Sequence, residues 1–207
     1  MIKTGSQDLD NFLKEYKEIS LIYGPGGSGK TTLALLAAIE QATKNKKVIF
    51  IDTENSFSTE RFTQLLDYKS KSCLENILIL NIKNFNIQHK HIKQLEEIKN
   101  ISLIIIDSIT NYYRRLYKSQ PELAKAMIAK QMIILNKITK NNIPIIITSQ
   151  VYSDMKDNVI PLANSVLPRY SQTIIKLEEK PRKIKIIKPE KKEIRFEIIN
   201  TGIKTLK

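Results

Sequence analysis

The sequence is poor in the residues that cross-link chains, mark secretion or span membranes. Cys73 is the one cysteine among 207 residues, so no disulfide can form within the chain. This composition is typical of a reducing compartment, and we expect a cytoplasmic protein. No apolar run approaches the roughly 20 residues that cross a bilayer. Residues 1–5 lack the apolar core of a signal peptide, so we expect no membrane contact.

Acidic residues are also in short supply. The chain has 34 lysines and arginines against 21 aspartates and glutamates, which gives a formal net charge of +13 and a pI near 9.7. Lysine-rich coding bias can produce such a balance, but its size favours a polyanionic partner, nucleic acid first. Apolar residues make up 42% of the chain, enough for a full core, and we find no linker or repeat. These features predict a single domain over residues 1–207.

Glycine occurs only 6 times, and most of these glycines lie in one short stretch. The stretch consists of Gly24, Pro25, Gly26, Gly27, Ser28, Gly29, Lys30, Thr31 and Thr32. It follows an apolar run and precedes a helical pattern, which is the strand–loop–helix context of a phosphate-binding P-loop. Glycine amides and the helix N-terminus would bind phosphates, Lys30 would neutralise them, and the Thr31 hydroxyl would ligate Mg²⁺. A glycine-rich turn without a ligand is disfavoured, because every fixed position of the motif matches.

Three further strands are predicted to end in polar residues. Lys47–Asp52 is followed by Glu54, Ile101–Ile106 by Asp107, and Ile143–Thr148 by Gln150. They are arranged in this order along the chain. In open α/β sheets, ligands bind beyond the carboxyl ends of the strands, so these side chains should face the P-loop. Asp107 would hold Mg²⁺ opposite Thr31, Glu54 would polarise the attacking water, and Gln150 would contact the γ-phosphate or that water.

The rest of the pattern predicts an α/β fold with a mainly parallel, twisted sheet flanked by helices. Further strands are expected at 77–81 and 171–177, and helices near 32–43, 87–99 and 122–140. Two alternating segments, 183–188 and 193–199, predict a C-terminal antiparallel hairpin. Segment 151–168 is expected to be an irregular loop. His89 and His91 form a His-x-His pair, which we interpret as exposed helix residues rather than a metal site, because no Cys or carboxylate cluster accompanies them.

Segment 111–120 mixes aromatic and basic side chains. Its candidate DNA contacts are Tyr112, Arg114, Arg115 and Lys118. Such residues can stack on bases and contact phosphates. A solvated loop with one or two tyrosines packed inward explains the same composition equally well, and the sequence leaves both interpretations open.

Taken together, these motifs resemble the RecA/RadA recombinase family. The resemblance rests on Gly24–Thr32, on Ile51–Glu54 with Phe57 and Glu60-Arg61, on Leu103–Ser108 and on Thr148–Tyr152. It extends over about residues 4–203 and is closest to archaeal members that lack an N-terminal helical DNA-binding domain. It implies a RecA-like P-loop ATPase core that uses ATP and Mg²⁺.

The resemblance also implies roles for individual residues. Lys30, Glu54 and Gln150 would serve catalysis, with Gln150 as the γ-phosphate sensor, and Arg61 and Gln64 would lie near the adenine. The first DNA loop would be near 112–120 and the second near 152–168. The second loop is short, and the phenylalanine-led oligomerisation segment is missing, which disfavours filament formation. The oligomeric state stays open.

The function expected from these features is that of an ATP-binding accessory protein in DNA repair and recombination, with weak ATP hydrolysis. Its partners would be DNA, expected to be single-stranded, and a recombinase or a Holliday-junction-processing protein. ATP is favoured over GTP because no Asn-Lys-x-Asp guanine motif is present. One alternative is a nucleotide-switched RecA-like interaction module without a DNA role. Another is a small P-loop kinase, which requires an arginine-bearing lid over the phosphates.

Overall fold

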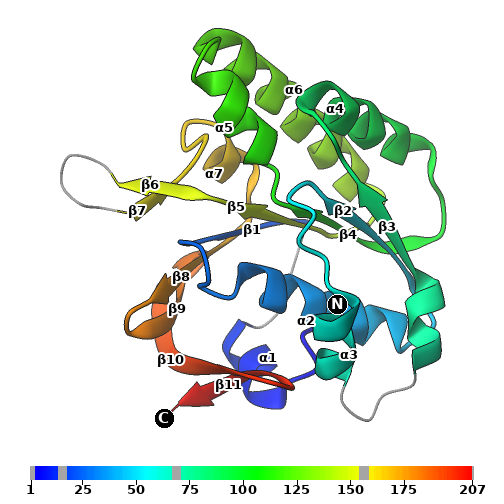
Figure 1. The fold of residues 1–207 in the computed structure, drawn as a ribbon, viewed down its shortest axis with the longest axis vertical. Helices are drawn as coiled ribbons and strands as arrows, with labels where there is room; N and C mark the ends of the chain where they lie inside the picture. Colours follow the sequence, from blue (N-terminus) through cyan, green and yellow to red (C-terminus); the bar gives the residue numbers. More distant parts are fainter. Residues whose placement is uncertain (1–2, 14–17, 67–70, 154–158, 207) are drawn as a thin grey trace.

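The protein is built on one large twisted sheet with helices on both faces (Figure 1). The computed structural model describes residues 3–13, 18–66, 71–153 and 159–206. The strand order in the main sheet is β11-β10-β9-β8-β1-β5-β4-β2-β3. This arrangement confirms the predicted RecA-like α/β class with a mainly parallel sheet.

Six neighbouring strands of the sheet run parallel. They are β8 (Thr173–Glu179), β1 (Ile19–Tyr23), β5 (Ile145–Ser149), β4 (Ile101–Asp107), β2 (Lys47–Asp52) and β3 (Ile77–Asn81). β1 and β5 are buried along their whole length, as expected for strands covered on both faces. The carboxyl ends of β1 and β5 are in register, since Tyr23 pairs with Ser149. Those of β2 and β4 are also in register, since Asp52 pairs with Asp107. The candidate site residues at and after these strand ends therefore meet at one edge of the sheet.

The C-terminal part of the sheet is antiparallel. β9 (Arg182–Lys188) and β10 (Lys192–Ile199) form the predicted hairpin, which pairs back onto β8 through β9. The structure adds a strand that the sequence did not predict, β11 (Gly202–Leu206), paired with β10. The predicted hairpin is therefore confirmed and extended into a four-strand antiparallel arrangement.

Two helical layers bury two separate apolar cores against the sheet (Figure 1). On one face lie α1 (Gln7–Leu13), α2 (Lys30–Ala42) and α3 (Thr59–Leu66), with η1 (Lys71–Asn76). On the other face lie α4 (Phe85–Gln94) with η2 (Leu95–Glu97), α5 (Asn111–Tyr117), α6 (Pro121–Thr139) and α7 (Leu167–Tyr170). Within the described part of the chain, no helix is long and apolar enough to span a membrane.

Two predicted loops are wrong. Residues 111–117 form helix α5, because Tyr112, Tyr113 and Leu116 lie at helical spacing and pack inward on the core of that face. Segment 151–168 begins with a short two-stranded ribbon, β6 (Val151–Ser153) and β7 (Val159–Pro161), and then contains the start of α7. The middle of that segment, 154–158, lies outside the described residues.

Candidate functional site

The P-loop connects β1 to α2 and has the backbone shape of an anion cradle. Gly27 and Gly29 adopt φ values of 71° and 102°, which side-chain-bearing residues rarely tolerate. The hydroxyl of Ser28 is buried and has no hydrogen-bond partner among the described residues. A cavity of about 180 Å³ lies at the loop, lined by Gly29, Lys30, Thr31 and Ile198 among others. Positive-φ glycines, an unsatisfied hydroxyl and a helix N-terminus together fit a bound phosphate chain.

Gly24 allows the P-loop to lie directly against strand β8. A Cβ atom at Gly24 would lie 2.4 Å from the carbonyl oxygen of Leu177 and 2.7 Å from Oγ of Ser28. We expect Gly24→Ala to force the loop away from β8, weakening ATP binding and lowering the free energy of unfolding by about 1–3 kcal/mol. Urea unfolding and ATP titration would measure both effects. Gly26→Ala is the matched control, because a Cβ there meets no atom within 4 Å. Equal stability of the two variants would contradict the expectation.

Lys30, at the first position of α2, folds back over the loop. Its Nζ donates hydrogen bonds to the carbonyl oxygens of Gly24 at 2.9 Å and Pro25 at 2.8 Å. Burial lowers the pKa of the Lys30 ammonium, while the nearby carboxylates of Asp107 and Glu54 act in the opposite direction. The Lys30 ammonium thus interacts electrostatically with both the Asp107 and the Glu54 carboxylates. A phosphate chain in the cradle would offer it stronger, charge-assisted partners than two carbonyls.

Thr31 and Asp107 lie together as the sequence predicts. The Thr31 hydroxyl donates to a carboxylate oxygen of Asp107 at 2.6 Å, and Thr148 of β5 donates to the other carboxylate oxygen. Burial raises the pKa of Asp107, and the hydrogen bonds from Thr148 and Thr31 oppose this rise. A hydroxyl and a carboxylate at this spacing are hard oxygen donors. They suit Mg²⁺, which is commonly held by one or two such groups together with phosphate oxygens and water.

Glu54 and Gln150 are brought into direct contact. Nε2 of Gln150 donates to Oε1 of Glu54 at 2.7 Å, and Oε1 of Gln150 accepts from Nη1 of Arg114 on α5 at 3.2 Å. One amide therefore bridges a carboxylate at the nucleotide side and an arginine on the exposed side of α5. A cavity of about 550 Å³ lies beside this bridge, lined by Glu54, Gln150 and Arg115 among others.

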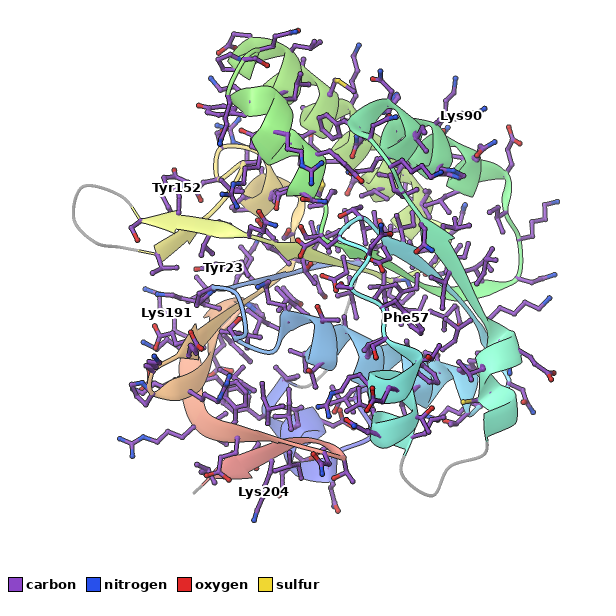
Figure 2. The ribbon with its side chains drawn as sticks, viewed as in Figure 1. Tyr23, Phe57, Lys90, Tyr152, Lys191 and Lys204 are labelled. Carbon is purple, nitrogen blue, oxygen red and sulfur yellow. The ribbon has the colours of Figure 1, made fainter. Side chains whose placement is uncertain are left out.

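Sequence reasoning missed the residues that hold Glu54 in place. The buried carboxylate of Asp52 accepts hydrogen bonds from the backbone amides of Glu54, Ser56 and Phe57, so it fixes the turn after β2. Phe57, labelled in Figure 2, lies on the segment after this turn. The Thr53 hydroxyl donates to the carbonyl oxygen of Ser108, which ties the turn to the end of β4. An Asp at a strand end followed by small polar residues is a signal for such a turn.

Arg61 and Gln64, predicted to lie near the adenine, are on α3. Arg61 donates to the carbonyl oxygens of Ile199 and Asn200 and to the side chain of Gln64. Ile198, adjacent to these acceptors, lines the P-loop cavity, and its side chain would lie 3.0 Å from a Cβ at Gly29. Arg61 thus contacts the chain just after Ile198, and neither Arg61 nor Gln64 lines the P-loop cavity. Their place near the adenine stays a prediction.

A further arginine reaches the P-loop from the C-terminal strands. Nη1 of Arg182 on β9 donates to the carbonyl oxygen of Gly27 at 2.9 Å. No local sequence signal indicates this contact, because the two residues are separated by 155 positions and meet only through the sheet. It is one arginine on a strand and not the arginine-bearing lid that a small kinase would require.

The candidate DNA residues on α5 divide into two groups. Arg114, Arg115 and Lys118 are exposed. Tyr112 is only 9% exposed, and its hydroxyl donates to the carbonyl oxygen of Ile82 at 2.7 Å. Tyr112 therefore packs in the core and offers no stacking face, which corrects the prediction for this residue. His89 and His91 are half-buried rather than exposed, and no cluster of metal-ligating side chains forms among the described residues.

Comparison with known proteins agrees with this geometry. The model of the Rad51 family matches residues 1–205. The chain is 36% identical to the DNA repair and recombination protein RadB of Methanococcus maripaludis (strain C7), covering 97% of each chain. It is 33% identical to RadB of Thermococcus sibiricus, covering 100% of this chain and 96% of that one. A crystal structure of the RadB recombinase matches with a TM-score of 0.82 at 30% identity over the full length of both chains. The chain therefore belongs to the Rad51 family, in its RadB group.

Proposed function

We propose that this protein binds ATP with Mg²⁺ and single-stranded DNA as an accessory factor in recombination, and that it hydrolyses ATP slowly. The observation that carries the proposal is the side-chain bridge from Glu54 through Gln150 to Arg114. It links the nucleotide side of the sheet to an exposed basic helix over two hydrogen bonds. Membership of a family of DNA repair and recombination proteins supports the same role.

The nucleotide half of the proposal assigns one task to each polar group. The P-loop amides and Lys30 would bind the phosphates, and Thr31 with Asp107 would hold Mg²⁺, whose charge would stabilise the transferring phosphoryl group. The Glu54 carboxylate would orient and polarise the attacking water. Gln150, which contacts Glu54, would change hydrogen-bond partners when a γ-phosphate is present. This change would determine whether Gln150 keeps its hydrogen bond with Arg114.

The DNA half rests on charge and exposure. Arg114, Arg115 and Lys118 form an exposed basic surface on α5, next to a cavity of about 390 Å³ that they line with Asn111 and Gln150. The net charge of +13 adds a general attraction for phosphates. Phosphate contacts of this kind supply affinity that falls as salt is raised.

The DNA role is tested with the double variant Arg114→Ala/Arg115→Ala. We expect its affinity for single-stranded DNA to fall on the order of tenfold and its salt dependence to become shallower, with a log–log slope smaller by about 1–2, because two phosphate contacts are lost. Fluorescence anisotropy of a labelled oligonucleotide across a salt series, with and without ATP–Mg²⁺, would measure both quantities. Lys137→Ala/Lys140→Ala, two exposed lysines at the far end of α6, is the matched control.

An unchanged DNA affinity in the arginine variant would favour the alternative, a nucleotide-switched interaction module without a DNA role. A DNA affinity that changes neither with salt concentration nor with ATP–Mg²⁺ would remove the support for the proposed DNA-binding function. The wild-type response to ATP also matters, because the Glu54–Gln150–Arg114 bridge predicts that DNA affinity depends on the nucleotide state.

A further inference from the structure

Strand β8 is longer than its neighbour β1 and continues beside the P-loop. The last residue pair between these two parallel strands joins Tyr23 to Lys176, whereas β8 ends at Glu179. A Cβ atom at Gly24 would lie 2.4 Å from the carbonyl oxygen of Leu177, so this extension of β8 is in close contact with the loop. The turn from β8 to β9 therefore lies next to the proposed phosphate site.

Two side chains of opposite charge at this turn reach the same glycine of the P-loop. Glu179 and Arg182 are cross-strand partners in the β8–β9 hairpin. Nη1 of Arg182 donates to the carbonyl oxygen of Gly27 at 2.9 Å. Oε1 of Glu179 lies 3.5 Å from the position that a Cβ atom at Gly27 would occupy. Because side chains alternate along a strand, Glu179 is on the same face of the sheet as Leu177, which packs in the same core as α2.

The two charged groups are not used elsewhere in the described part of the chain. There, neither Glu179 nor Arg182 takes part in an ion pair, and the bond to Gly27 is the one hydrogen bond of the Arg182 guanidinium. A guanidinium has five N–H donors, so most of them remain available. The arrangement therefore directs one cation and one anion at the P-loop rather than at each other.

The P-loop needs a support of this kind because its glycines leave the backbone free. Gly27 has a φ of 71° and no side chain, so the peptide groups beside it can turn at little cost. Lys30 binds the carbonyl oxygens of Gly24 and Pro25, but it would exchange them for phosphate oxygens. Arg182 would then be the cation that still holds a carbonyl group of the loop.

We infer that Arg182 is a positioning residue for the phosphates of ATP and that Glu179 counteracts it. The inference rests on the proposed function and deepens its nucleotide half. By fixing the Gly27 carbonyl, the guanidinium preorganises the loop, and its charge attracts the phosphates from behind it. The Glu179 carboxylate lies at the same glycine and repels them. The β8–β9 hairpin thus sets the affinity for the nucleotide through two opposed charges.

Calorimetric titration with ATP and Mg²⁺ tests the two side chains separately. We expect Arg182→Ala to raise the dissociation constant about tenfold, because a charge-assisted hydrogen bond to the loop is lost. Glu179→Gln should lower the dissociation constant about threefold, because the amide keeps the size of the side chain and removes the repulsion. The double variant Arg182→Ala/Glu179→Gln should lie between the two single variants.

Conservative replacement separates positioning of the phosphates from a role in the fold alone. Arg182→Lys keeps the charge and a donor, so its dissociation constant should stay within about threefold of the wild-type value. A role of the hairpin in the fold alone gives Glu179→Gln no reason to bind ATP more tightly. Urea unfolding of each variant checks that it is folded, and if Arg182→Ala is not, the Glu179→Gln titration decides.

Arg195→Ala and Glu197→Gln are the matched controls. They make the same charge changes on β10, where both residues are exposed and flank the buried Phe196. Both should bind ATP as the wild type does, and a control that shifts affinity as its counterpart does would overturn the inference. Wild-type affinity in Arg182→Ala, or no tightening in Glu179→Gln, would overturn it while the proposed function stands. Failure of the wild type to bind ATP would overturn both.

Discussion

Replacing Lys30 by alanine should severely weaken ATP binding. Lys30 is the P-loop cation, and in the structure its ammonium donates to the two carbonyls at the mouth of the loop. Losing its contacts to the phosphates would remove about 3 kcal/mol, since hydrogen bonds to charged groups are each worth about 1.5–3 kcal/mol. That corresponds to a rise in the dissociation constant of roughly 100-fold or more. Calorimetric titration with ATP and Mg²⁺ measures it.

The control for this variant is Lys44→Ala, just past the other end of α2. Lys44 pairs with Glu40 and lies far along the helix from the phosphate cradle. It should bind ATP as the wild type does, which excludes a general effect of lost positive charge on this helix. Urea unfolding of both variants checks folding. If Lys30→Ala bound ATP with wild-type affinity, the assignment of the P-loop as the nucleotide site would be wrong.

Glu54→Gln should separate hydrolysis from binding. The amide keeps the size of the side chain and can still accept a hydrogen bond from Gln150, but it cannot act as a base or polarise water as a carboxylate does. We expect the rate of phosphate release to fall by about 10²-fold, with the ATP dissociation constant unchanged within about twofold. Single-turnover hydrolysis and calorimetry together measure the two quantities.

Glu60→Gln is the matched control for this experiment, because Glu60 is an exposed carboxylate on α3, six positions further along the chain. It should hydrolyse ATP at the wild-type rate. A Glu54→Gln variant that also does so would remove Glu54 from the catalytic mechanism and would leave the acidic group at this strand end with a structural role only.

Much of the fold was predictable because the parallel strands are continuous apolar runs. The predicted bounds of β2 and β3 match the structure, since each run is closed by polar residues on both sides. β11 was missed because five residues starting at a glycine carry little periodicity of their own. The strand exists through pairing with β10 and packing on α2, where Gly202 lies close to Leu36. Such tertiary stabilisation leaves little local signal.

Helix α5 was predictable in principle and was predicted wrongly. Its composition left two interpretations open, a DNA-contacting segment and a solvated loop with one or two tyrosines packed inward. The inward packing is confirmed for Tyr112 and Tyr113, but their spacing with Leu116 makes the segment a helix and not a loop. Periodicity was the better guide than composition here. The ribbon of β6 and β7 was not predictable, because strands of three residues are below the length at which alternation can be recognised.

The candidate site, like the fold, was predictable only in part. Residues that follow strands, such as Glu54, Asp107 and Gln150, were placed by the rule that ligands lie at the carboxyl edge of a parallel sheet. Their contacts were not predictable in detail, since the bridge from Gln150 to Arg114 depends on α5 being a helix. The contact of Arg182 with Gly27 depends on the antiparallel strands returning to the P-loop.

The packing of β8 and β10 against the P-loop has a consequence for the order of events during translation. Gly24 packs on the backbone of Leu177, and Gly29 lies against Ile198. The ribosome makes the loop well before it makes these two supports, and domains fold as their parts emerge. A nascent chain thus carries an unsupported phosphate cradle until β8 and β10 have been made, and the proposed nucleotide site is complete only when these strands have docked.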